Sequence, residues 1–154
     1  MEVFNLLDGE LPDVTGNIDG HSFKATSLGR RHDAHLVGMG IYELPPGESK
    51  WPYHYELNEE EWAIVVSGEV TVRTPDGERV LRQGDTICFP VGEKGAHAFR
   101  TTGDTPARIA MPSTLAPHGY ASVYPDSGKI QVVGPGFRRI VALGPELAYW
   151  EGET

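Results

Sequence analysis

Residues 61–84 read EWAIVVSGEVTVRTPDGERVLRQG, and this stretch decides the fold. On both sides of residues 74–77, apolar and polar residues alternate, which is typical of half-buried strands. Between them, TPDGE places a proline before an Asp-Gly pair, a combination that closes a tight turn between antiparallel strands. The stretch therefore predicts a β-hairpin.

Short β-rich segments of the same kind continue on both sides of this hairpin. They begin near Leu36 and are separated by turn-forming stretches such as PPGE, VGEKG and TGDTP. The chain contains 19 glycines and 12 prolines among 154 residues, which leaves little room for long helices. Regularly spaced short strands predict an all-β fold, an antiparallel sandwich or barrel with little helix.

The length of 154 residues is sufficient for one domain. Residues 1–35 mix turn-forming and charged residues without a clear period, so we expect an irregular amino-terminal arm packed on the barrel. Residues 36–154 are expected to form the β-barrel domain with a carboxyl-terminal tail. Because Tyr149 and Trp150 favour burial, the tail is expected to cover the barrel or a neighbouring subunit.

Charge and cysteine content exclude several classes of partner. The formal net charge is −9, from 22 acidic and 13 basic residues, and the sequence has no basic stripe to neutralise phosphates. We therefore expect no nucleic acid and no membrane as partner, and a small-molecule ligand instead.

Cys88 is the single cysteine, which fits a reducing compartment. The first residues show no basic segment followed by an apolar run, so we expect a cytoplasmic protein.

Histidines and acidic residues gather where apolar strands begin. His54 and Glu56 are two residues apart on a predicted strand, so their side chains share one face. Glu61 opens the next strand, and a carboxylate buried there is unfavourable unless a cation or hydrogen-bond donors lie close to it. His97 follows a glycine-rich loop at the head of a later strand. It can complete a cluster with the other three.

These positions match two motifs of a known family, and the sequence resembles a small single-domain cupin. The first motif is matched by Gly47, His54, Glu56, Glu61 and Gly68, and the second by Gly84, Pro90, Gly92 and His97, with two extra residues before the histidine. The resemblance implies a jelly-roll β-barrel in which one divalent metal ion is held by His54, Glu56, Glu61 and His97. Glu56 departs from the pattern, because it stands where the family usually has its second histidine.

Three roles remain open for Glu56. As a direct ligand, it would give a set of two imidazoles and two carboxylates, which favours manganese, iron(II) or zinc over nickel and copper. As a general base, it would lie beside a metal ion held by His54, Glu61 and His97. The third alternative is that the metal site has been lost. Glu60 is a further candidate for proton transfer, and an alternative ligand if the strand register shifts by one residue.

Several large side chains near these segments are candidates for a substrate-binding wall: Trp51, Trp62, Phe99 and Met111.

One scaffold can carry several chemistries, so three functions stay open. The first is a metal-dependent enzyme acting on a small polar metabolite, such as a sugar or sugar-phosphate isomerase, with Glu56 or Glu60 moving a proton. The alternatives are an iron or manganese dioxygenase and a non-catalytic ligand-binding protein. Cupins commonly pair, so the resemblance also implies a homodimer.

Overall fold

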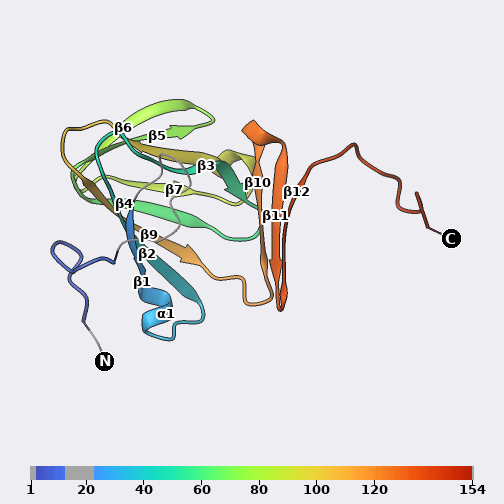
Figure 1. Ribbon diagram of the computed structural model, residues 1–154, viewed down its shortest axis with the longest axis horizontal. Coiled ribbons are helices and arrows are strands. Elements are labelled where there is room, and N and C mark those ends of the chain that lie inside the picture. Colours follow the sequence, from blue (N-terminus) through green and yellow to red (C-terminus); the bar gives the residue numbers. More distant parts are fainter. Residues whose placement is uncertain (1–2, 13–22, 154) are drawn as a thin grey trace.

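Two antiparallel sheets packed face to face form the protein, as the computed structural model shows (Figure 1). The structure describes residues 3–12 and 23–153. One sheet has five strands in the order β1-β2-β9-β4-β7, and the other has seven in the order β12-β11-β10-β3-β8-β5-β6. The predicted all-β class and the jelly-roll arrangement are confirmed.

The strand bounds follow the sheet order. The five-stranded sheet consists of β1 (Lys24–Ser27), β2 (Val37–Leu44), β9 (Ala107–Thr114), β4 (Glu61–Ser67) and β7 (Thr86–Phe89). The seven-stranded sheet consists of β12 (Phe137–Ala142), β11 (Lys129–Gly134), β10 (Tyr120–Tyr124), β3 (Ser49–Glu56), β8 (His97–Thr101), β5 (Glu69–Thr74) and β6 (Gly77–Arg82). The helical elements of the described ranges are α1 (Leu28–Arg31) and the short 3-10 segments η1 (Glu93–Gly95) and η2 (Pro125–Ser127). None of these is long and apolar enough to cross a membrane.

The hairpin predicted from TPDGE is present. Strands β5 and β6 pair along their whole length, and Thr74 faces Gly77 at the closed end. Gly77 has a φ of 109°, a conformation that glycine adopts without the steric penalty of a side chain. The local turn chemistry therefore fixed this part of the sheet.

Two parts of the fold differ from the expectation. Within the predicted irregular arm, β1 pairs with β2 and leads into the helical turn α1. At the other end of the chain, residues 137–142 form β12, which pairs with β11 through six residue pairs. Both strands lie at sheet edges, where a strand can be polar or charged because only one neighbour pairs with it. The boundary drawn at residue 35 stays a prediction.

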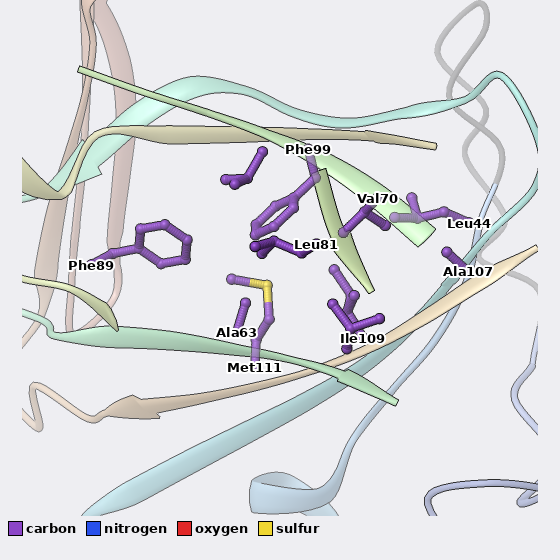
Figure 2. Close-up of a cluster of buried hydrophobic side chains, with 11 residues drawn as sticks. Leu44, Ala63, Val70, Leu81, Phe89, Phe99, Ala107, Ile109 and Met111 are labelled. Carbon is purple, nitrogen blue, oxygen red and sulfur yellow. The ribbon is translucent and has the colours of Figure 1, made fainter. Parts of the chain in front are cut away.

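The main core fills the space between the two sheets (Figure 2). Its side chains come from both sheets and include Leu44, Ala63, Val65, Val70, Val72, Phe89, Phe99, Ile109 and Met111. In β4, Ala63 and Val65 point into this core, whereas Ile64 and Val66 point to the outer face. The alternation also turns Glu61 inward, because it shares the face of Ala63 and Val65.

A second cluster of apolar side chains covers the outer face of the five-stranded sheet. Leu11 of the amino-terminal segment packs there with Ile41 and Val66. Arg108, which is 8% exposed, donates from Nη1 to the backbone carbonyls of residues 6, 7 and 9 and from Nε and Nη2 to Glu43. The segment 3–12 is therefore fixed to the sheet by apolar packing and by one buried guanidinium. Because this segment packs on the outer face of the five-stranded sheet, β4 is apolar on both of its faces.

Candidate metal centre

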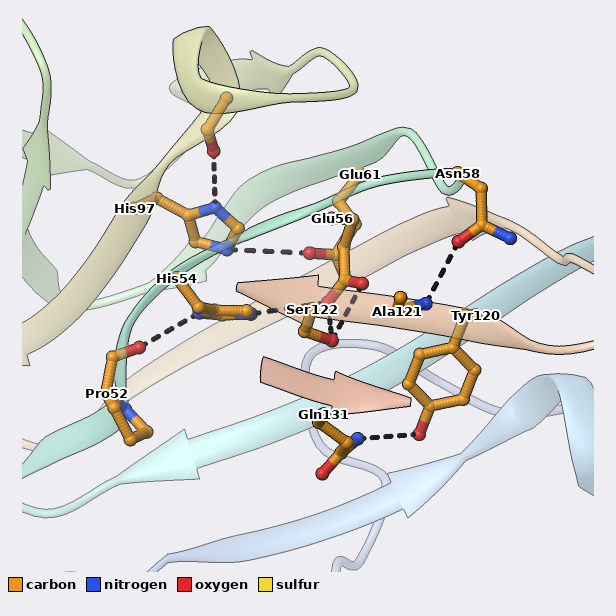
Figure 3. Close-up of polar contacts among 11 residues, drawn as sticks. Pro52, His54, Glu56, Asn58, Glu61, His97, Tyr120, Ala121, Ser122 and Gln131 are labelled. Atoms are coloured by element: carbon orange, nitrogen blue, oxygen red, sulfur yellow. Dashed lines mark hydrogen bonds and ion pairs between the residues drawn. The ribbon is translucent and has the colours of Figure 1, made fainter. Parts of the chain in front are cut away.

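Strands β3 and β8 place two histidines side by side. His54 and His97 face each other across this strand pair, with ring centroids 4.7 Å apart. Both are buried, with exposed fractions of 7% and 1%. From the opposite sheet, Glu61 at the start of β4 points toward them (Figure 3). The two motifs identified in the sequence thus meet between the sheets.

Backbone carbonyls orient both imidazole rings. The Nδ1 atom of His54 lies 2.9 Å from the carbonyl of Pro52, and that of His97 lies 2.9 Å from the carbonyl of Gly95. A carbonyl only accepts, so each Nδ1 carries the proton and each Nε2 presents its lone pair. This outer support is common around histidines that bind metals, because it holds the ring and its tautomer in place.

Three side chains form a set suited to a divalent ion. The nearest ligand atoms of His54, Glu61 and His97 all lie within 4.8 Å of one another. His97 Nε2 and Glu61 Oε2 are 3.6 Å apart, and both are buried without a hydrogen-bond partner among the described residues. An ion about 2.1 Å from each ligand separates adjacent ligand atoms by about 3 Å. The donor types and the two unpartnered atoms fit a divalent metal ion, which would satisfy both atoms and draw the three ligand atoms closer together.

Glu56 lies beside this set but outside it. Its Oε1 is 3.6 Å from His54 Nε2, and Ser122 Oγ lies 2.8 Å from both of its carboxylate oxygens, to which it can donate (Figure 3). Ser122 comes from β10, the strand next to β3. Direct ligation by Glu56 stays a prediction, and the contact with Ser122 fits a carboxylate that adjoins the metal residues.

Burial shifts the protonation of these groups. It raises the pKa of Glu61 to about 7, and the charges of nearby carboxylates add to the shift. Burial also raises the pKa of Glu56 to about 7, although the hydrogen bond from Ser122 acts in the opposite direction. The pKa of His97 falls to about 3, first because of burial and then because of His54. His97 is therefore neutral at physiological pH and can coordinate a cation.

The raised pKa of Glu61 gives a prediction for the stability of the metal-free protein. A group whose pKa is higher in the folded state stabilises the fold fully below its unfolded value, near 4.5, and loses that contribution as the pH rises to about 7. Wild type measured in chelator should therefore lose on the order of 2–3 kcal/mol relative to Glu61→Gln between pH 4.5 and 8. Urea unfolding of both proteins across this range measures the difference, and parallel curves would contradict it.

A cavity of about 310 Å³ adjoins the three metal-site residues. Its wall includes Tyr42, Trp51 and Met111. Trp51 has a φ of 59°, which is unusual for a residue with a bulky side chain, and its ring meets Tyr42 edge-on at 4.6 Å. The register of β3 shifts between residues 50 and 54. Strained backbone at such a position is a feature of functional sites, and here it directs an aromatic ring to the cavity.

The other predicted site residues lie elsewhere. Glu60 and Trp62 are on the outer face of the five-stranded sheet, where the indole Nε1 donates to Glu60 Oε1 over 3.2 Å, and both line a separate surface hollow. Adjacent residues of a strand point to opposite faces. Because the Glu61 side chain points inward, the side chains of Glu60 and Trp62 on either side of it point outward. Phe99 belongs to the core and packs edge-on against Trp51. The roles predicted for Glu60, Trp62 and Phe99 stay predictions, and of the predicted substrate contacts Trp51 and Met111 line the cavity beside the three clustered residues.

The turn before His97 gives a second prediction. A Cβ atom on Gly95 would lie 1.9 Å from the carbonyl oxygen of Pro90, so the turn has to move in Gly95→Ala. The carbonyl of Gly95 then no longer orients His97, and we expect metal affinity to fall by about 10–100-fold. Gly92→Ala, which meets no atom within 4 Å but has a φ of 86°, strains the same turn without this overlap. Titration with zinc should show the larger loss at Gly95, and equal affinities would contradict the role of the carbonyl.

Sequence reasoning missed several residues around the centre. Tyr124 stacks on His54 with ring centroids 5.7 Å apart, and Ser122 contacts Glu56. Both lie on one face of the short segment ASVY, and that alternation is the only signal the sequence offers for them. Tyr42 and Arg30 also line the cavity. Nothing in the local pattern around Arg30 distinguishes it from an exposed charge.

Comparison with known proteins agrees with this geometry. The cupin domain family (Cupin_2) matches residues 40–124, which include all three clustered residues and the strands that carry them. The chain belongs to the cupin family. No curated protein sequence matches this cupin.

Solved structures of proteins with different functions share this fold. A cupin-superfamily sugar phosphate isomerase from Silicibacter pomeroyi is 22% identical, with a TM-score of 0.76 over 89% of this chain and 90% of that one. The polyketide cyclase RemF from Streptomyces resistomycificus is 20% identical, with a TM-score of 0.60 over 74% and 79%. A predicted oxalate decarboxylase from Thermotoga maritima is 19% identical, with a TM-score of 0.60 over 75% and 100%. At these identities the likeness establishes the fold alone.

Proposed function

We propose that this cupin holds one divalent metal ion through His54, Glu61 and His97 and acts as an isomerase on a small polar metabolite, a sugar or sugar phosphate. The observation that carries the proposal concerns two buried atoms at the cavity wall, His97 Nε2 and Glu61 Oε2, which have no hydrogen-bond partner within residues 3–12 and 23–153. Such atoms are unfavourable unless a cation satisfies them. The similarity in fold to a sugar phosphate isomerase supports the choice of reaction class.

Each group has a defined part in this proposal. A bound divalent ion would supply Lewis-acid polarisation of a substrate carbonyl. Glu56 accepts the proton from the carbon next to the carbonyl and returns it to the former carbonyl carbon, while the proton of the adjacent substrate hydroxyl passes to the former carbonyl oxygen. The Glu56 pKa of about 7 suits transfer in both directions near neutral pH. Ser122 holds the Glu56 carboxylate through its hydroxyl. Trp51 and Met111 belong to the apolar part of the wall, which orients the substrate.

A second candidate function is an iron(II) or manganese dioxygenase. The specific observation in its favour is the ligand set itself, because two histidines and one carboxylate with open positions are typical of non-haem iron oxygenases. Oxygen consumption by the iron-loaded protein with a panel of small substrates distinguishes this function from isomerisation, which consumes no oxygen.

The proposal is tested by assaying metal-loaded and chelated protein against aldose and ketose phosphates and the corresponding free sugars. We expect interconversion that requires metal and is lost in Glu56→Gln. If Glu56→Gln keeps its metal and loses turnover, Glu56 is the proton-transfer group; if it loses both, Glu56 is a ligand. Thermal stabilisation by a sugar without product would favour the non-catalytic ligand-binding alternative and contradict isomerisation.

A further inference from the structure

We propose that Arg30 recognises an anionic oxygen group, a phosphate monoester or a carboxylate, on the substrate of this cavity; this inference rests on the proposed function. Arg30 lies in α1 and lines the same cavity as His54, Glu61 and His97. Within residues 3–12 and 23–153, no carboxylate forms an ion pair with its guanidinium. A guanidinium is suited to oxyanions because it offers several N–H groups in a planar fork.

The position of Arg30 is set by the packing of α1 on β2. Ser27 caps the helical turn by accepting from the backbone N–H of Arg30. Gly29 is buried against Gly38, and a Cβ atom on Gly29 would lie 3.2 Å from the Cα of Gly38. This close approach of α1 to β2 brings Arg30 to the cavity. Arg30 is therefore held at its wall by a fixed backbone.

Tyr42 indicates how the charged groups are arranged along the cavity. Burial raises the pKa of its hydroxyl, the charge of Glu61 raises it further, and the charge of Arg30 lowers it. Tyr42 therefore lies within electrostatic range of both the metal-site carboxylate and the guanidinium. A ligand with a carbonyl at the metal end and an anionic group at the Arg30 end matches this arrangement. In a chain of net charge −9, an anionic ligand needs such a local cation to bind.

Three probes with related short skeletons test the proposal: glycerol 3-phosphate, glycerate and glycerol. Calorimetric titration of zinc-loaded wild type should show tighter binding of at least one anion than of glycerol. We expect Arg30→Gln to weaken the binding of that anion by about 10-fold or more and to leave the affinity for glycerol unchanged. Arg31→Gln is the matched control, because Arg31 lies over the Phe4 ring at 5.7 Å and does not line the cavity. The tighter anion identifies the phosphate or the carboxylate class.

Equal anion affinity in wild type and Arg30→Gln overturns the role of Arg30, as does a wild type that binds both anions no better than glycerol. Elemental analysis of the same samples keeps this outcome separate from failure of the proposed function. If Arg30→Gln has the metal content and the anion affinity of wild type, only the role of Arg30 is overturned. Wild-type protein that takes up no metal removes the proposed function, and chelated wild type and Arg30→Gln then test the anion contact by themselves.

Discussion

His97→Ala protein purified without chelator should contain less than about a tenth of the metal found in wild type. His97 is 1% exposed, its Nδ1 is held by the carbonyl of Gly95, and its Nε2 lies 3.6 Å from Glu61 Oε2 with no hydrogen-bond partner in the described part of the chain. Removing it leaves two ligands for the ion, and a two-ligand site competes poorly with water. Elemental analysis measures the loss for zinc, iron and manganese together.

Two further variants separate metal binding from folding. His97→Ala also removes the ring that stacks on Phe89 at 3.8 Å, so His97→Gln, which is closer in volume, is measured beside it. His118→Ala is the matched control, because His118 is exposed and lies outside the cluster. Full metal content in a folded His97→Gln protein would show that the ion lies elsewhere.

Phe99→Ala should lower the free energy of unfolding by about 3–5 kcal/mol. Phe99 is 2% exposed in the main core, and its ring packs edge-on against Trp51, Phe89 and His97. The truncation therefore leaves a cavity beside Trp51 of the cavity wall and beside His97 of the candidate metal centre. Urea unfolding measures the loss as a lower midpoint with an unchanged slope.

Trp62→Ala is the comparison for this core variant. Trp62 is 43% exposed on the outer face of the same two-sheet structure, so its truncation should lower the free energy of unfolding by less than about 1 kcal/mol. A larger loss at Trp62 than at Phe99 would contradict the assignment of the two faces. Because neither residue is a ligand, both variants should bind metal if folded.

The position of Glu61 could be predicted from the sequence, since it depends on a local rule. Side chains alternate along a strand, so the inward-facing residues Ala63 and Val65 require Glu61 to face inward as well. The hairpin between β5 and β6 was predictable for the same kind of reason, because a proline and an Asp-Gly pair restrict the backbone locally. The family motifs added His54 and His97, and the structure brings both to Glu61.

The remaining features depend on which distant strands become neighbours. Ser122 reaches Glu56 only because β10 pairs with β3, and Arg30 reaches the cavity only because α1 packs on β2. These pairings lower the free energy of the whole sheet, and no short pattern encodes them. The sequence by itself therefore determined most of the strands, the alternation of their faces and the residue types of the candidate metal ligands. Tertiary structure decided which polar residues surround them, because contacts across the sheets join segments far apart in the chain.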